Sequence, residues 1–297
     1  MSDRTGAVEA AFIRACKLDV EVVKPGNVSL ASPGHGMTAA LFVASAVAAA
    51  PALCASGLPV GRRILNAIEA SWAAAHCNTN LGIVLLCAPI ASALEGVDEG
   101  REAVGPREAL RQLLERRLQA LTVDDAVDAF RAIALANPGG LGTAADQDVH
   151  REPTVNLLAA MALAADWDMI ARQYTTGFSA LFTTGLPAWD AGLASSGNDE
   201  HHAMQRVFLS FLAEFEDSHI VRKHGAAAAQ AVAKQASQWL ERVVADGTSA
   251  QAGLVRWDAD LKASGINPGT SADLAVATVF TVGALFSRFG HVATRAV

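Results

Sequence analysis

Several patterns are missing from this 297-residue chain, and each absence removes a class of protein. No segment alternates apolar and polar residues as a half-buried strand does, and aromatic residues make up only 6%. The phosphate-binding motifs GxxxxGK(S/T) and GxGxxG are absent, as is the nucleophile motif GxSxG. We therefore expect neither a P-loop or Rossmann nucleotide site nor an α/β-hydrolase.

Basic charge is also scarce. The 23 Lys and Arg residues are outnumbered by 30 Asp and Glu, for a net charge of −7, so we expect no broad surface for nucleic acid. The four cysteines form no CxxC pair and have no zinc spacing; they are Cys16, Cys54, Cys77 and Cys87. This favours reduced, mostly buried thiols in a cytoplasmic protein.

Long apolar runs are lacking as well. Residues 38–55 contain Ser45 and Pro51, and residues 81–94 and 274–286 are too short to span a bilayer. The N-terminus carries acidic residues early, unlike a signal peptide. We expect three core helices here and no membrane partner.

What the chain does have is alanine in abundance, with 52% hydrophobic residues overall, a composition that favours helices. Helical spacing of the apolar residues predicts one all-α domain. The expected helices are residues 5–22, 37–50, 59–76, 78–94, 108–121, 122–136, 154–165, 167–186, 201–216, 226–245, 249–263 and 274–286. The one over 167–186 is expected to be interrupted near residues 175–177.

The most informative stretch is Asn267-Pro268-Gly269-Thr270-Ser271-Ala272-Asp273. Pro268 and Gly269 break the chain, and Thr270 or Ser271 can cap the apolar helix that follows. Asp273 either complements the dipole of that helix or serves as a catalytic or metal-binding carboxylate at an anion-binding helix start. From this motif alone the first alternative is favoured.

A second motif, Lys24-Pro25-Gly26-Asn27, ends the first expected helix. It leads into a small, polar loop in which His35 has a glycine on each side, a composition that lets backbone approach a ligand closely. Lys24 as a solvated residue at a helix end and His35 as a surface histidine are equally acceptable alternatives.

Three further segments carry polar residues of interest. Asn78 and Thr79 precede a helix, where Asn78 is a good N-cap. Residues 146–150 combine two carboxylates with a histidine, which we interpret as an ordinary loop, or a lid, rather than a metal site. Residues 217–225 hold Asp217, basic residues and two histidines; the cations suit a helix end, whereas Asp217 does not, because the dipole disfavours a carboxylate there.

Together these motifs resemble the triphosphoribosyl-dephospho-coenzyme A synthase family over most of the chain. The resemblance rests on Lys24-Pro25-Gly26-Asn27-Val28, His35 with Met37, Asn78-Thr79 before Gly82, Asp217-Ser218 through Lys223 and Gly225, and Pro268 through Leu274. It implies an enzyme in which a hydroxyl of dephospho-coenzyme A attacks C1′ of the ATP ribose and expels adenine, with Mg²⁺ on the triphosphate.

The resemblance also implies roles for individual residues. The catalytic candidates are Asp273, Asp217 and His35, and the same two aspartates are the candidate metal ligands. The candidate nucleotide-binding residues are Lys24, Gly26, Asn27, Asn78, Thr79, Arg222, Lys223, Gly269, Thr270 and Ser271. We expect the loops after Val23, His76, Glu216 and Ile266 to converge on one site.

The chain departs from the family pattern in places. The usual Asn-Thr-His-Lys-Gly reads Asn78-Thr79-Asn80-Leu81-Gly82, and the Asp expected before Met37 is Gly36. These changes indicate a divergent branch, similar to homologues in methanogens and methylotrophs. Two alternatives therefore stay open: the same ATP-ribosyl chemistry on another acceptor, as in one-carbon cofactor synthesis, or a non-catalytic helical binding protein. A homodimer is also open.

Overall fold

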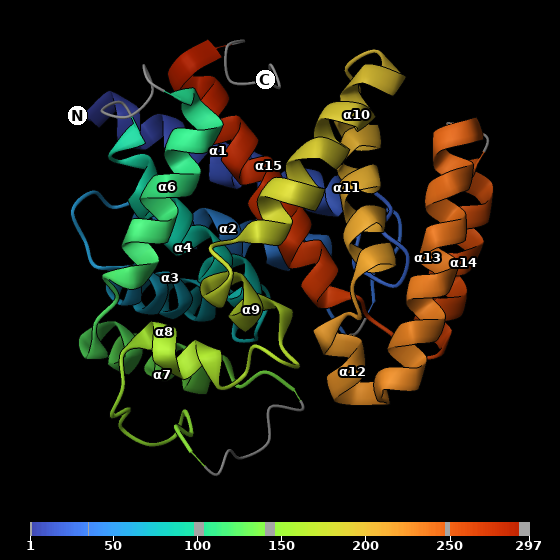
Figure 1. Cartoon of the computed structure of the whole chain (residues 1–297). Helices are drawn as coiled ribbons and strands as arrows, with labels where there is room; N and C mark the ends of the chain where they lie inside the picture. Colours follow the sequence, from blue (N-terminus) through green and yellow to red (C-terminus); the bar gives the residue numbers. More distant parts are fainter. Residues whose placement is uncertain (1, 35, 98–103, 140–145, 247–249, 291–297) are drawn as a thin grey trace. The chain divides into compact units, whose positions relative to one another are not determined.

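The computed structural model of the chain (Figure 1) describes residues 2–34, 36–97, 104–139, 146–246 and 250–290. Within these ranges the regular structure is helical, and the one strand-like pairing is a single bridge between Gly34 and Met37. The all-α class predicted from the sequence is therefore confirmed.

The helices group into two compact units. The first comprises residues 1–15, 44–179 and 280–297, and the second comprises residues 16–43 and 180–279. Three helices contribute residues to both units: α1 (Ser2–Glu21), α2 (Ala39–Leu53) and α15 (Gly269–Phe289). That the two units form one domain stays a prediction.

The first unit is built around α4 (Leu81–Leu94), which is apolar on every side and buried along its length, as its sequence predicts. The helices packed in this unit are α3 (Val60–Ala75), α6 (Pro106–Gln119), α7 (Val123–Ala136), α8 (Leu157–Ala162) and α9 (Met169–Thr175). The buried hydroxyl of Tyr174 on α9 donates to the carbonyl of Leu85 at 2.7 Å. This bond fixes α9 against the core helix.

Helices α3 and α7 approach each other closely because Gly61 has no side chain. A Cβ at that position would lie 2.4 Å from the Cα of Asp125. The N–H of Gly61 donates to Oδ1 of Asp125 at 2.7 Å. The other carboxylate oxygen accepts the N–H and hydroxyl of Thr122, which completes a capping box at the start of α7.

The second unit contains η1 (Leu181–Gly185), α10 (Leu186–Ser196), α11 (Glu200–Glu214), α12 (Ser218–His224), α13 (Ala226–Asp246) and α14 (Gln251–Ala263). Close helix contacts again use glycine, since a Cβ on Gly192 of α10 would lie 2.6 Å from the Cα of Ala203 on α11. The rings of Trp239 and Trp257 stack between α13 and α14, with ring centroids 6.2 Å apart.

Helix α15 is the one described helix that is long and apolar enough to cross a membrane, yet 78% of its most apolar window is buried within the protein. Packing therefore accounts for its composition. The expectation that residues 274–286 form a core helix is confirmed, whereas the expectation that this segment is too short to span a bilayer is wrong, because the helix extends from Gly269 to Phe289.

Some helix boundaries differ from those expected. Helix α4 begins at Leu81 rather than residue 78, and α15 begins at Gly269, several residues early. The interruption near residues 175–177 is present, because Gly177 and Phe178 have positive φ angles. Beyond it the helix continues through a π-helical turn to Ser196, ten residues past its predicted end at 186.

We expect Gly61→Ala to destabilise the protein by about 1–3 kcal/mol, the usual scale for overpacking, because the new methyl group would meet the backbone of α7. Urea-induced unfolding measures this change. Gly6→Ala is the matched control: Gly6 is exposed on α1, and a methyl group there would have nothing within 4 Å, so alanine should stabilise by up to about 1 kcal/mol. Equal unfolding midpoints for the two variants would contradict the close α3–α7 contact.

Candidate active site

Three segments singled out in the sequence meet at the start of α15 within the second unit. They are the loop after α1, the segment that opens α12, and residues 264–268, which lead into α15. Side-chain and backbone hydrogen bonds join the first two segments to the third and to the first turn of α15. Of the four loops predicted to converge, those after Val23 and Glu216 each bind the segment after Ile266, and the fourth, after His76, belongs to the first unit.

The loop after α1 is attached to the segment before α15 through Asn27 and Asn267. The amide of Asn27 donates to Oδ1 of Asn267 at 3.0 Å, and both side chains are buried. Beside this pair, Gly26 has a φ of +84°, and a Cβ on it would lie 2.8 Å from Cδ of Pro268. Glycine is therefore required both by backbone conformation and by space.

Lys24 is fully buried, which excludes the alternative of a solvated lysine at a helix end. Its ammonium donates to the carbonyl of Asp19 at 2.7 Å and to Oδ1 of Asn27 at 3.0 Å, and lies 3.1 Å from Oδ1 of Asp19. Burial raises the pKa of Asp19 above its ordinary value, and the nearby Lys24 opposes that rise. The buried carboxylate requires a cation, and Lys24 reaches back to supply it.

Asp217 is the anion at the start of α15. Its Oδ2 accepts the N–H of Ser271 at 2.7 Å and the Ser271 hydroxyl at 2.8 Å. Its Oδ1 accepts the N–H groups of His219 and Ile220 at 2.9 and 3.2 Å, which makes Asp217 the N-cap of α12. One carboxylate thus caps two helices.

This arrangement corrects two expectations from the sequence. Asp217 lies at a helix N-terminus, where the dipole favours a carboxylate, rather than at the end of the preceding helix. The cap of α15 comes from Asp217 rather than from Thr270 or Ser271. Burial raises the pKa of Asp217, and the hydrogen bonds from Ser271, Ile220 and His219 oppose that rise.

Helix α12 lies along the segment that leads into α15 (Figure 1). A Cβ on Gly269 would come within 2.7 Å of Nδ1 of His219, so the absence of a side chain lets the imidazole ring lie against the helix start. At the other end, Nε2 of His224 is 3.1 Å from the carbonyl of Gly265. Arg222 is half-buried and Lys223 is exposed, which places two cations on this short helix.

Asp273 lies in the second turn of α15 and is half-exposed, whereas Thr270 and Ser271 in the first turn are buried. It follows the Asp217-capped turn directly. The neighbours on its face of the helix, Ala277 and Phe280, are fully buried. A carboxylate with access to solvent therefore lies beside an apolar, buried helix face.

Two residues of this cluster were missed in the sequence. Asp258 and Lys262 on α14 form an ion pair at 2.9 Å, and both bind the loop after α1. Helix 249–263 is predicted only as an ordinary amphipathic helix. The detectable signal was an acid and a base at i,i+4 spacing, which is common on solvated helix faces and so indicates no site by itself.

A protein-family profile described as CitG, ATP:dephospho-CoA triphosphoribosyl transferase, matches residues 5–291 of the chain. The chain belongs to the CitG family. The resemblance inferred from the motifs is thus confirmed, and the protein is a transferase of a family that moves the triphosphoribosyl group of ATP.

A solved structure supports the same fold for this CitG-family chain. It is the crystal structure of an Archaeoglobus fulgidus protein assigned as a triphosphoribosyl-dephospho-CoA synthase. The TM-score is 0.58 at 23% sequence identity, and the match covers 81% of this chain and 97% of the other. Comparison with curated proteins gave no match.

The remaining predicted site residues of this family member are placed as follows. Asn78 and Thr79 lie in the first unit, where Oδ1 of Asn78 accepts the N–H of Leu81 at 3.2 Å and the hydroxyl of Thr79 donates to Ser45 Oγ at 2.7 Å. Asn80 rather than Asn78 is the N-cap of α4. His35 lies outside the described residues.

The described residues contain no group of three or more His, Cys, Asp or Glu side chains arranged to hold a metal ion. In the loop at 146–150, Oδ1 of Asp148 accepts the N–H of His150 at 2.9 Å, a local turn contact that fits an ordinary loop. The magnesium predicted for Asp217 and Asp273 is therefore not a preformed protein cage within this part of the chain.

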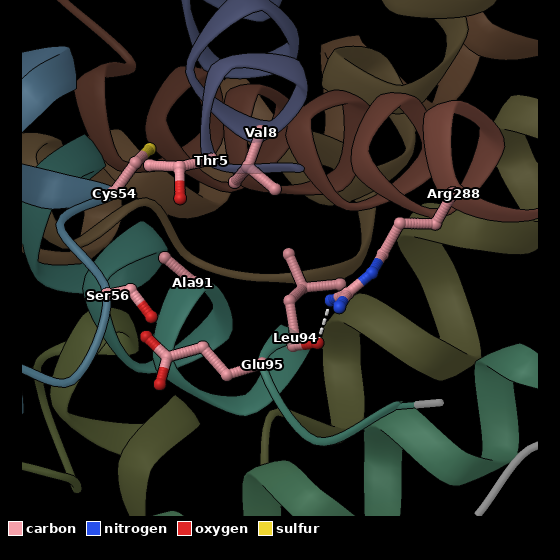
Figure 2. Close-up of a pocket in the computed structure, with 8 residues that line it drawn as sticks. All are labelled: Thr5, Val8, Cys54, Ser56, Ala91, Leu94, Glu95 and Arg288. Carbon is pink, nitrogen blue, oxygen red and sulfur yellow. Dashed lines mark hydrogen bonds between the residues drawn. The ribbon is translucent and has the colours of Figure 1, made fainter. Parts of the chain in front are cut away.

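The first unit contains a separate small cavity of about 140 Å³ (Figure 2). Its lining is formed by Thr5, Val8, Cys54, Ser56, Ala91, Leu94, Glu95 and Arg288. The charged groups on its wall are engaged with the fold, since Glu95 binds Arg63 and Arg288 donates to the carbonyl of Leu94. Burial raises the pKa of Cys54 to about 12, so its thiol stays protonated at neutral pH.

We expect Lys24→Ala to lower the free energy of unfolding by about 3–5 kcal/mol, because it leaves Asp19 charged and buried without a cation. Thermal unfolding followed by circular dichroism measures the loss. Lys17→Ala, which removes the same charge from an exposed position of α1, should change stability by less than about 0.5 kcal/mol.

The deficit of Lys24→Ala should shrink as the pH is lowered. Burial raises the folded-state pKa of Asp19 above its unfolded value, and removal of Lys24 takes away the opposing influence. The folded variant is then penalised at neutral pH and relieved as the carboxyl takes up a proton in acid. A deficit that is constant between neutral and acidic pH would contradict the buried ion pair.

Proposed function

We propose that this CitG-family protein transfers the triphosphoribosyl group of ATP to a hydroxyl of dephospho-CoA at a site located at the start of α15. The observation that carries the proposal is the meeting of three characteristic motifs there, through the Asn27–Asn267 and Asp217–Ser271 bonds. These motifs are far apart in the chain, and buried polar contacts join them. Such contacts favour one defined arrangement of the segments.

Asp273 is the carboxylate best suited to react. Of the four carboxylates described in this cluster, Asp19, Asp217 and Asp258 are buried and bound to cations or to backbone N–H groups. Asp273 is half-exposed and one turn from the capped helix start. A group that must meet substrate needs this access, so we assign Asp273 as the general base and Asp217 as a positioning residue.

The proposed reaction is a substitution at C1′ of the ATP ribose. The acceptor hydroxyl oxygen forms a bond to C1′, and the bond from C1′ to the adenine nitrogen breaks with its electron pair, so that adenine leaves and takes up a proton. The hydroxyl proton passes to the Asp273 carboxylate. Positive charge that develops on the ribose in the transition state is stabilised by a nearby carboxylate.

The triphosphate requires positive groups in a chain of net negative charge. Lys223 is exposed and Arg222 half-exposed on α12, which is held beside residues 265–271 at both ends by the His224 and Asp217 contacts. We assign these two cations to the phosphates, with Gly269 and Thr270 lining the approach. Lys24 and Ser271 are already engaged inside the fold, so we assign them to holding Asn27 and Asp217 in place.

We propose that Mg²⁺ enters this site bound to the phosphates of ATP. Mg²⁺ is commonly held by substrate phosphates, water and one or two carboxylates, which suits a cluster with a single half-exposed acid. Asp273 would be the protein carboxylate nearest such an ion, whose charge would offset that of the triphosphate.

We propose dephospho-CoA as the acceptor and the cytoplasm as the setting, supported by the family description and by the free thiols. All four cysteines are free, in keeping with a reducing cytoplasm where ATP is available. Dephospho-CoA is the acceptor that the family description supports. The replaced residues in the Asn78–Gly82 motif favour testing a second acceptor class, the hydroxyl-bearing precursors of one-carbon cofactors.

Chromatographic detection of free adenine from ATP and Mg²⁺, with and without dephospho-CoA, tests the function. We expect release that depends on the acceptor, and we expect Asp273→Asn to lower turnover by about 10²-fold or more, the scale for removing a general base. The melting temperature should stay close to wild type, because the substitution keeps the size of a half-exposed side chain.

Asp124→Asn is the matched control, since Asp124 is an exposed acid in the first turn of α7 and lies outside the proposed site. It should leave turnover unchanged. If Asp273→Asn also leaves turnover unchanged, Asp273 is only a helix-dipole residue and the base assignment fails. Recovery of Asp273→Asn activity at raised Mg²⁺ would identify Asp273 as a metal ligand instead, and absence of any adenine release would favour a non-catalytic binding protein.

A further inference from the structure

Helix α14 holds the loop after α1 at two points with one ion pair. Oδ1 of Asp258 accepts the N–H of Gly26 at 2.9 Å, and Oδ2 accepts from the Lys262 ammonium at 2.9 Å. The same ammonium donates to the carbonyl of Ser32 at 2.8 Å and to its hydroxyl at 2.7 Å. We call Asp258 and Lys262 together the α14 clasp.

The clasp encloses the part of the loop that carries Asn27. It grips the chain at Gly26 on one side of Asn27 and at Ser32 on the other. The stem of Lys262 also lies against Gly34, where a Cβ would be 3.1 Å from Cε of Lys262. The segment that is joined to Asn267 at the start of α15 is therefore held from a second helix.

The two charges of the clasp are buried, although apolar side chains at these positions would stabilise the helix as well. The side chains of Asp258 and Lys262 are only 4% and 12% exposed, so both groups give up most of their hydration. A buried ion pair gives little net stability over an apolar pair of similar volume. What the ion pair adds is geometry, because its hydrogen bonds to Gly26 and Ser32 fix the loop in one conformation.

We propose that Asp258 and Lys262 are positioning residues that preorganise the Gly26–Ser32 loop for ATP. This inference rests on the proposed function and adds to it how the nucleotide site is kept in its binding conformation. With the clasp intact, Asn27 is already in place when ATP arrives. Without it, ordering of the loop has to accompany binding and weakens affinity.

The decisive variant is the double substitution Asp258→Asn with Lys262→Met. Each single substitution leaves the other charge buried and unpaired, so each is expected to lose stability. The double variant removes both charges, keeps an oxygen near the Gly26 N–H, and keeps an apolar stem against Gly34. Its unfolding midpoint should therefore recover towards wild type. Lys262→Arg preserves the cation, so this variant should bind ATP more tightly than the double variant, although less tightly than wild type.

Two measurements test the positioning role without requiring turnover: hydrogen exchange reports the order of the loop, and calorimetry reports the affinity for ATP. Hydrogen exchange of the backbone amides in residues 26–34 should be faster in the double variant and unchanged elsewhere. Calorimetry with ATP and Mg²⁺, without acceptor, should show about tenfold weaker binding. All variants are measured at a temperature at which circular dichroism shows them to be folded.

The control is the half-exposed pair Glu108 and Arg111 on α6, which is also an acid and a base on one helix. Glu108→Gln with Arg111→Met neutralises a pair in the same way and should leave ATP binding and loop exchange unchanged. A clasp variant that regains both stability and wild-type ATP affinity would overturn the positioning role, as would unchanged exchange in residues 26–34. If the wild-type protein itself binds no ATP, the proposed function fails, and the nucleotide role of the clasp fails with it.

Discussion

The second unit depends on one carboxylate. Asp217 accepts hydrogen bonds from the first turn of α12 and from the first turn of α15, so a single negative charge satisfies N–H groups at two helix starts. Helix dipoles make both positions favourable for an anion. Because the two bonded turns share one side chain, the cations of α12 and the polar residues at the start of α15 are held in a fixed relation. The candidate site is built on that relation.

The same principle recurs around Asp217. Lys24 neutralises Asp19 and orients Asn27, and Lys262 neutralises Asp258 and grips Ser32. In both pairs a buried acid is matched by a base, and each pair also binds backbone or amide groups of the loop after α1. Buried charges that are paired and hydrogen-bonded are tolerated in a core, whereas unpaired ones are costly. The outcome is a set of bonded, buried polar groups attached to the segment that opens α15, the helix that carries the half-exposed Asp273.

The motifs in the sequence identified the family correctly, but they did not predict which residues bind each other. Sequence reasoning leaves Lys24 either as a solvated residue at a helix end or as a nucleotide-binding residue, and neither interpretation includes Asp19, whose side chain lies beside it in the fold. Asp217 was unexplained at the end of α11, since residues 218–224 were not expected to begin a new helix. Asp258 and Lys262 carried only the spacing of a surface ion pair. In each of these cases the residue's binding partner is brought to it by the tertiary structure.

The sequence by itself determined the helical class, the buried character of α4 and α15, and the family. These follow from composition, from the 3.6-residue period and from short motifs, all of which act within one segment. Only the tertiary structure decided that Asp217 caps α15, that Lys24 is buried, and that α14 holds the loop of Asn27. The physical reason is that a buried charged group must pair with a residue that tertiary packing brings next to it. Such a residue can be far away in the sequence, so local patterns do not reveal it.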